Sequence, residues 1–280
     1  MSILQHKIDF MALVSVTMAN GNGDPLSDNR PRSGSDSKGI LSSFCIKRKI
    51  RNRMQDLGTQ IFVQSDDRAD DGFRNLCQRA DTLLDGIKDR DEYFRKACET
   101  WLDVRSFGQV FAFKDKSGDA CRVRGPVSIH HALSVSPVEA ESMKITKSVN
   151  AANKTNGKAS DTMGWHHYVR FGLYKVQGSI CVQLAEKTGF TDEDAQVLKE
   201  CLRTLFVNDA SAARPDGSMR VVKLFWWEHN CKDGQYPSWK VHESIDPVLK
   251  PGVVSPSQVE DYDICVTPLE GLAMEEIEGL

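Results

Sequence analysis

Apolar side chains recur at every second position near the start of the chain. They are Ile8, Phe10, Ala12, Val14, Val16 and Met18. Met11 and Leu13 place apolar groups on the opposite face of the same extended segment. A strand that is apolar on both faces is typical of the middle of a sheet. The pattern therefore predicts a central, buried β-strand over residues 7–18.

A second pattern follows with the helical period. Ile46, Ile50, Met54 and Leu57 fall on one stripe, which predicts a helix over residues 40–57, and Gly58 suits its C-terminal cap. The segment between strand and helix is polar. Its two Asn-Gly pairs tolerate positive φ and are expected to end the strand, and its prolines disfavour helix.

The rest of the chain is expected to alternate between strands and helical segments. Strands are expected over 61–63, 122–138, 168–182, 221–228 and 262–266, and a buried aromatic strand or turn over 105–112. A helical block is expected over 72–102. A second helix is expected to start at Thr191, where Asp194 completes a capping box, and to run to Phe206. Residues 150–164 lack an apolar period and are expected to form an exposed arm.

The order of these elements defines a fold class. When the helical block and the polar arm are set aside, a β-α-β-β-α-β pattern remains. This pattern is that of the ferredoxin-like fold, which the RRM domain shares. We therefore expect an α+β protein in which a ferredoxin-like or RRM-like unit carries two insertions.

Charge is distributed unevenly around a net value of −3. Residues 30–53 contain one acid, Asp36, and residues 144–170 contain one acid, Asp161, among many cations. Two basic regions in a nearly neutral chain favour a polyanionic ligand. The eight cysteines show no zinc-type spacing, and scattered thiols indicate a reducing compartment, so we expect a cytoplasmic protein.

Targeting and membrane segments are not expected. Asp9 interrupts the apolar run near the N-terminus, which argues for a strand rather than a secretion signal. The sequence has no run of about 20 apolar residues, the length that a transmembrane helix needs.

The strand, loop and helix over residues 8–57 form the first candidate site. A glycine-rich loop before a basic helix can offer backbone N–H groups and cations to phosphate. Neither a Walker A motif nor a dinucleotide fingerprint is present, and an ordinary polar loop remains an alternative. The cations of the helix have no acidic partner at four-residue spacing. The candidates are Asn20, Asn22, Arg30, Arg32, Lys47, Arg48, Lys49 and Arg51.

Further candidates come from two aromatic segments. Residues 105–112 match part of the RNP1 signature, which makes Arg105 and Phe107 candidates for RNA contact. His166 and His167 lie beside aromatic and basic residues and suit stacking better than metal binding. We expect no metal site and no cofactor. Asp24 and Asp36 could support metal-assisted RNA cleavage, although no second carboxylate cluster accompanies them.

Several segments together resemble the backbone subunits of CRISPR Cascade complexes, in particular the type I-C subunit. They are NGNGDP at 20–25, NRPR at 29–32, IKRKIRN at 46–52, DVRSFG at 103–108, RGPV at 124–127 and SAAR at 211–214. The resemblance covers most of the chain. It implies an RRM-like palm (residues 1–64, 102–138 and 168–280), helical fingers (65–101) and a thumb (139–167). It adds Lys147 and Arg214 to the RNA-binding candidates.

The resemblance also implies a function and partners. The chain would be a non-enzymatic subunit that binds guide RNA (crRNA) and polymerises head-to-tail into a helical filament. It would present the guide to target DNA in antiviral defence. Its partners would be the crRNA-processing, large and small subunits and, indirectly, a nuclease-helicase, with no membrane. Two alternatives stay open: a metal-dependent RNA endonuclease that uses a loop aspartate, and an unrelated metabolic domain of ferredoxin-like fold.

Overall fold

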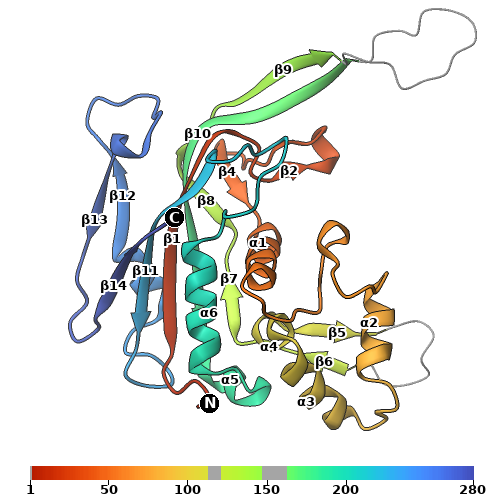
Figure 1. The fold of residues 1–280 in the computed structure, drawn as a ribbon. Helices are drawn as coiled ribbons and strands as arrows, with labels where there is room; N and C mark the ends of the chain where they lie inside the picture. Colours follow the sequence, from red (N-terminus) through yellow and green to blue (C-terminus); the bar gives the residue numbers. More distant parts are fainter. Residues whose placement is uncertain (1, 113–120, 147–162) are drawn as a thin grey trace, which may run out of the picture.

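The computed structural model describes residues 2–112, 121–146 and 163–280 of the chain. Its main feature is a large antiparallel sheet flanked by helices and small hairpins (Figure 1). The strands of this sheet are β1 (Ile8–Ala19), β4 (Lys38–Leu41), β7 (Val127–Ile129), β8 (Ala132–Pro137), β9 (Ala140–Thr146), β10 (Met163–Ile180), β11 (Met219–Glu228) and β14 (Met274–Glu278).

Helices and small hairpins make up the remainder. The helices are α1 (Ser43–Asp56), α2 (Leu76–Leu83), α3 (Arg90–Thr100), α4 (Leu102–Phe107), α5 (Val182–Thr188), α6 (Asp192–Arg203) and α7 (Ser238–Glu243). The hairpins pair β2 (Gly23–Asp24) with β3 (Arg30–Pro31), β5 (Gln109–Phe111) with β6 (Cys121–Val123), and β12 (Ile245–Leu249) with β13 (Tyr262–Val266). Short 3₁₀ turns lie at Pro25–Ser27, Asp66–Arg68 and Val259–Asp261.

The predicted central strand is confirmed. The sheet order is β14-β11-β1-β10-β8-β4, with β7 and β9 also paired to β10. Strand β1 lies between β10 and β11 and is antiparallel to both, so that Ala12 pairs with Val176 on one side and Leu224 on the other. Because both edges of β1 are hydrogen-bonded, the strand holds the two halves of the fold together.

Each face of the sheet has its own apolar core. Phe10 and Ala12 pack with Ile46 and Ile50 of α1 and with Leu198 of α6 on one face. On the other face, side chains of β1 and β11 pack against α7 and the β12–β13 hairpin. The members that define this second core are Met11, Leu13, Phe225, Val241 and Tyr262. This double coverage explains why β1 is apolar at both odd and even positions.

A third core lies outside the main sheet, in the block formed by α2, α3, α4 and the β5–β6 hairpin. Phe62, Trp101 and Phe111 form its aromatic centre, with ring centroids 4.7 to 6.3 Å apart. Buried Arg79 joins this block to the preceding loop, because its guanidinium donates to Asp71 and to the Phe62 carbonyl. Figure 1 shows the block as a separate lobe beside α1.

The structure corrects several predicted elements. Residues 38–41 form strand β4, so the basic helix begins at Ser43, where the Ser42 hydroxyl accepts from the Cys45 N–H. Residues 61–63 form no strand, the helical block is split into α2 and α3, and 122–138 contains three strands rather than one. The Thr191–Asp194 capping box is confirmed, and so is positive φ at Gly58.

The RNP1-like segment also differs from the prediction. Residues 102–107 form helix α4, and only residues 109–111 are extended. Gly108 makes the break, with φ of 81°. In addition, both faces of the main sheet are covered by other elements. Phe107 therefore lies on a helix and not on an open sheet surface.

Candidate nucleic-acid interface

Two loops meet at the start of helix α1. The Asn22 side-chain oxygen accepts from the Ser42 N–H at 2.8 Å, which ties the 20–32 loop to the helix cap. The Asn20 N–H donates to the Ala213 carbonyl at 2.9 Å, which brings in the 208–218 loop. The Asn20 side-chain amide donates to the Asn29 carbonyl at 2.7 Å and holds the first loop closed. Asn20 and Asn22 thus shape the site through their own hydrogen bonds.

The glycines of this loop serve close packing rather than positive φ. A Cβ on Gly21 would lie 2.7 Å from the Leu41 side chain, and a Cβ on Gly23 would overlap the Asn29 side chain. Positive φ occurs instead at Asp28 and Asn29. The Asn-Gly pairs follow the end of β1 at Ala19, as predicted, and their glycines provide space between neighbouring segments.

The amide donors at the helix start are already engaged. The Cys45 N–H donates to the Ser42 hydroxyl at 3.2 Å, and the Ser43 N–H donates to His131 Nδ1 at 2.9 Å. The Ser42 N–H is taken by Asn22. Because these donors have protein partners, the predicted backbone cradle for phosphate is not open at these positions, and the groups left to attract an anion here are the cationic side chains.

Two cations of α1 have buried acidic partners from distant parts of the chain. The Lys49 ammonium, 3% exposed, forms an ion pair with Asp209, and Lys49 also lies over the Phe206 ring. Arg51 Nε lies 2.8 Å from a fully buried oxygen of Asp103. The absence of acids at helical spacing therefore did not mean an absence of partners. These pairs join α1 to the rest of the fold.

Lys47 and Arg48 are placed differently. The Lys47 ammonium lies 5.3 Å from the centre of the Phe107 ring, and no ion pair to it occurs within the described ranges. Arg48 donates to the Val63 carbonyl at 2.7 Å, while its Nη2 has no described hydrogen-bond partner. Burial and, secondly, the charge of Arg51 lower the pKa of Lys47 and lower that of Arg48 to about 10. A nearby anion would relieve this repulsion.

The loop arginines complete the basic surface around α1. Arg30 is exposed on β3. Arg32 lies 3.3 Å from Asp24, and Arg214 Nε lies 3.4 Å from Asp209. Asp209 therefore contacts two cations, Lys49 and Arg214, and links the 208–218 loop to the helix.

Arg105 and Phe107 are held by α4. Arg105 makes a two-pronged contact with Asp194 through Nε and Nη2, at 2.7 and 2.8 Å. It thereby connects α4 to the capping box of α6. The Phe107 ring lies beneath Lys47 and beneath the Arg51 guanidinium, 5.1 Å away. Phe107 supports the cations of α1, and Arg105 fixes the element that carries it.

The β9–β10 ribbon carries His166 and His167 on opposite faces, because neighbouring residues of a strand point in opposite directions. His167 is buried and stacks on Trp165. Its Nδ1 shares a hydrogen bond of 2.7 Å with the Ser142 hydroxyl. Lys144, paired with Trp165 across the ribbon, lies over the Trp165 ring. Lys147 lies outside the described residues.

The acidic residues of the first loop have local partners. Asp24 accepts from the Leu26 N–H at 3.2 Å and contacts Arg32, and Asp36 accepts from the Lys38 N–H. In the part of the chain that the structure describes, no group of three or more His, Cys, Asp or Glu side chains is arranged to hold a metal ion. Among the described helices, none is long and apolar enough to cross a membrane.

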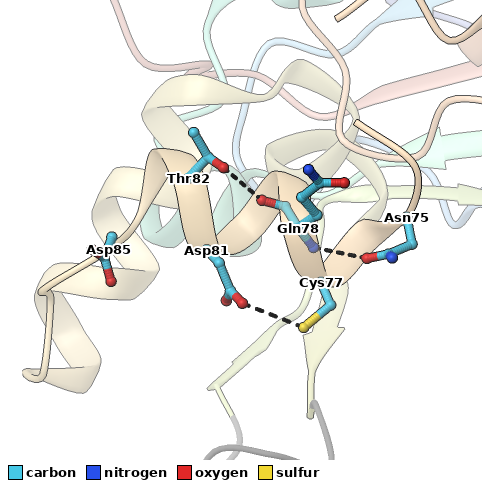
Figure 2. Close-up of a pocket in the computed structure, with 6 residues that line it drawn as sticks. All are labelled: Asn75, Cys77, Gln78, Asp81, Thr82 and Asp85. Carbon is cyan, nitrogen blue, oxygen red and sulfur yellow. Dashed lines mark hydrogen bonds between the residues drawn. The ribbon is translucent and has the colours of Figure 1, made fainter. Parts of the chain in front are cut away.

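A separate hollow lies along α2, away from the basic residues. It has a volume of about 740 Å³ and is lined by Asn75, Cys77, Gln78, Asp81, Thr82 and Asp85 (Figure 2). Figure 2 shows the Cys77 thiol directed toward Asp81 and the Thr82 hydroxyl toward the Gln78 carbonyl. Its described lining includes two carboxylates and no cation, and such a lining does not suit a phosphate.

Sequence reasoning missed two residues at this surface. Asp209 escapes detection because it lies 160 positions from Lys49. Phe44, 78% exposed on the first turn of α1, precedes Lys47 and Arg48 by three and four positions. That spacing places the three side chains on one side of a helix, a signal that a helical projection of the sequence contains.

The comparisons with known proteins agree on one family. The family model described as CRISPR-associated protein Cas7 matches residues 6–267. A Haloferax volcanii protein described as CRISPR-associated protein Cas7 is 28% identical over 211 residues, which cover 66% of this chain and 60% of that protein. This chain thus spans less than two thirds of that relative's length.

Solved structures share the fold. A chain of a "CRISPR RNA-guided surveillance complex, pre-nicking" superposes with a TM-score of 0.50 at 15% identity, covering 79% of this chain and 78% of that one. A chain of a "CRISPR RNA-guided surveillance complex" gives a TM-score of 0.47 at 16% identity, covering 89% and 78%. The first likeness shows a common mixed α/β architecture with a large antiparallel sheet.

Proposed function

Because this chain belongs to the CRISPR-associated Cas7 family, we propose that it is a guide-RNA-binding backbone subunit of a CRISPR surveillance complex. The observation that carries the proposal is the basic surface around α1. Lys47 and Arg48 lie side by side there without a described ion-pair partner, and Arg30 is exposed on the adjoining loop. Cations held in place without acidic partners suit a ligand with regularly spaced negative charges.

The proposed RNA-binding residues divide by role. The proposed phosphate contacts come from Lys47 and Arg48 of α1, from the loop residues Arg30, Arg32 and Arg214, and from Lys147. Lys49, Arg51, Arg105 and Phe107 position these cations through the buried contacts described above. Asn20 and Asn22 hold the loop against the helix. His166 and His167 belong to the β9–β10 ribbon, where His167 beside Trp165 on one face and His166 beside Tyr168 on the other would stack with bases.

We also propose the RRM-like palm with fingers and thumb. The order β11-β1-β10-β8 places the last and third strands of a β-α-β-β-α-β unit on either side of the first, with α1 and α6 on one face. The separate third core supports a fingers lobe, and the β9–β10 ribbon supports a thumb that projects from the sheet (Figure 1). The proposed boundaries are 65–101 for the fingers and 139–167 for the thumb.

The projecting ribbon supports a head-to-tail assembly. A projecting ribbon that reaches the next copy makes a head-to-tail contact that does not close, and such a contact builds a filament. We propose that copies of the chain polymerise along the crRNA of a type I-C complex in the cytoplasm. The guide would pair with target DNA, while other subunits process the crRNA, complete the complex and recruit the nuclease-helicase. Base pairing supplies sequence specificity, so the subunit needs neither contacts that read the sequence nor catalysis.

The salt dependence of RNA binding tests this proposal. Log K for single-stranded RNA falls with log salt by about 0.7 for each phosphate contact. We expect Lys47→Ala to weaken binding and to reduce that slope by about 0.7. The matched control is Lys240→Ala, because Lys240 also lies over an aromatic ring, 4.9 Å from the centre of Tyr236, but on α7. An unchanged slope in Lys47→Ala would remove the phosphate assignment.

A further inference from the structure

Phe44 is an aromatic side chain that the fold leaves in solvent. It lies in the first turn of α1 and is 78% exposed. Burying an aromatic ring is favourable by a few kcal/mol, so an exposed ring on a well-packed helix is available to a ligand. The local backbone is firmly held, because the N–H groups on either side of it donate to His131 and to the Ser42 hydroxyl.

The neighbours of Phe44 along the helix are cations. The residues at positions i+3, i+4 and i+7 are Lys47, Arg48 and Arg51. These spacings place all of them on the same side of the helix, while Ile46 and Ile50 face the core. Phe44 and Lys47 are separated along the axis by about 4.5 Å, one short turn of helix.

Charge indicates which ligand fits this surface. Helix α1 contains no acidic residue before Asp56. Of the three cations beside Phe44, Arg51 is paired with Asp103, and the other two have no described ion pair. An apolar protein partner would need contiguous apolar surface, whereas this ring is followed by positive charge. Single-stranded nucleic acid matches both features, because it offers flat bases for stacking and phosphates for the cations.

We infer that Phe44 stacks against one unpaired base of the bound RNA while Lys47 and Arg48 hold the adjoining phosphates. This inference rests on the proposed function and adds a base-contacting residue to a surface that otherwise recognises the backbone. Stacking is tolerant of sequence, because every base has a π-face. The residue therefore positions a base without selecting it, as a subunit that accepts any guide requires.

Fluorescence of 2-aminopurine in a short single-stranded RNA tests the inference, together with affinity and its salt slope. Stacking on Phe44 quenches the base, and we expect Phe44→Ala to restore fluorescence and weaken binding by about 5- to 100-fold. The salt slope should stay unchanged, because a phenyl ring releases no counterions. Phe44→Trp should keep both quenching and affinity, and Phe44→Leu should lose them although it remains apolar.

Trp239→Ala is the matched control, since Trp239 is 62% exposed on α7, a helix of the other face of the sheet. Unchanged affinity and quenching in Phe44→Ala overturn the inference and leave the proposed function standing. Wild-type RNA affinity in Phe44→Leu overturns stacking. If Phe44→Ala loses RNA affinity only to the extent that it loses self-association, Phe44 belongs to a contact between copies of the chain. If wild-type protein and Trp239→Ala both fail to bind RNA, the proposed function and the inference fall together.

Discussion

The buried pair between Lys49 and Asp209 gives the sharpest prediction about the fold that supports the basic surface. The two side chains are 3% and 10% exposed, so removing one leaves the other charge poorly solvated. Breaking such a pair from one side costs about 3–5 kcal/mol. Asp209 also lies 3.4 Å from Arg214. The two single substitutions are therefore not equivalent.

We expect Asp209→Asn to lower the free energy of unfolding by about 3–5 kcal/mol, because it leaves Lys49 and Arg214 without their carboxylate. Lys49→Met should cost less, about 2 kcal/mol, since Arg214 still neutralises Asp209. The double variant removes both charges of the pair. Its cost should fall short of the sum of the single costs by about 2 kcal/mol.

Urea unfolding followed by tryptophan fluorescence and circular dichroism measures all four proteins of this cycle. The dependence on urea should keep its slope, so that the midpoints report stability. Additive single and double effects would refute the reasoning, and so would a larger cost for Lys49→Met than for Asp209→Asn. The folded Lys49→Met protein should also keep the wild-type salt slope for RNA, unlike Lys47→Ala. In the wild-type protein the Lys49 ammonium is already paired with Asp209, so its removal should release no phosphate contact.

Two further predictions concern the central strand β1 and its neighbour β10. Gly178→Ala should lower the free energy of unfolding, measured by urea, by about 1–3 kcal/mol, because the added Cβ would lie 2.5 Å from the Ser128 carbonyl oxygen. Gly164→Ala should cost less, because its Cβ would lie 3.4 Å from the nearest side-chain atom. Burial would raise the pKa of Asp9, but hydrogen bonds from His229, Lys7 and Ser238 outweigh it and lower that pKa below 3.8. The stability that Asp9 contributes is therefore present above pH 3.8 and lost as pH falls through the lower folded pKa, and Asp9→Asn should flatten that acid limb.

Sequence patterns predicted the elements that are determined by contacts between residues close together in the chain. The apolar period of β1, the stripe of α1 and the Thr191 capping box each use contacts within a few positions, and all three are present. Ile40 and Leu41, the second half of β4, were included in the predicted helix because this four-residue strand carries no strong period. The RNP1-like match misled for a similar reason, since a motif of residue types does not distinguish α4 from a strand.

The location of the basic surface proposed as the site was predictable from the sequence, but the pairing of its cations was not. A run of cations on α1 indicated the surface. Which cations are free depends on Asp103 and Asp209, which lie 52 and 160 positions away from their partners. Arg105 is likewise taken by Asp194, 89 positions away. No periodicity reports such pairs, because they form only when the loops and helices pack.

The most direct test of the account is the size and nucleic-acid content of the protein made with and without a CRISPR array. Gel filtration with absorbance at 260 and 280 nm measures both together. A guide-binding backbone subunit should elute from array-containing cells as a larger particle with a raised 260/280 ratio and RNA that ribonuclease removes. Elution at the same size, with the same protein-like ratio in both preparations, would contradict the central claim.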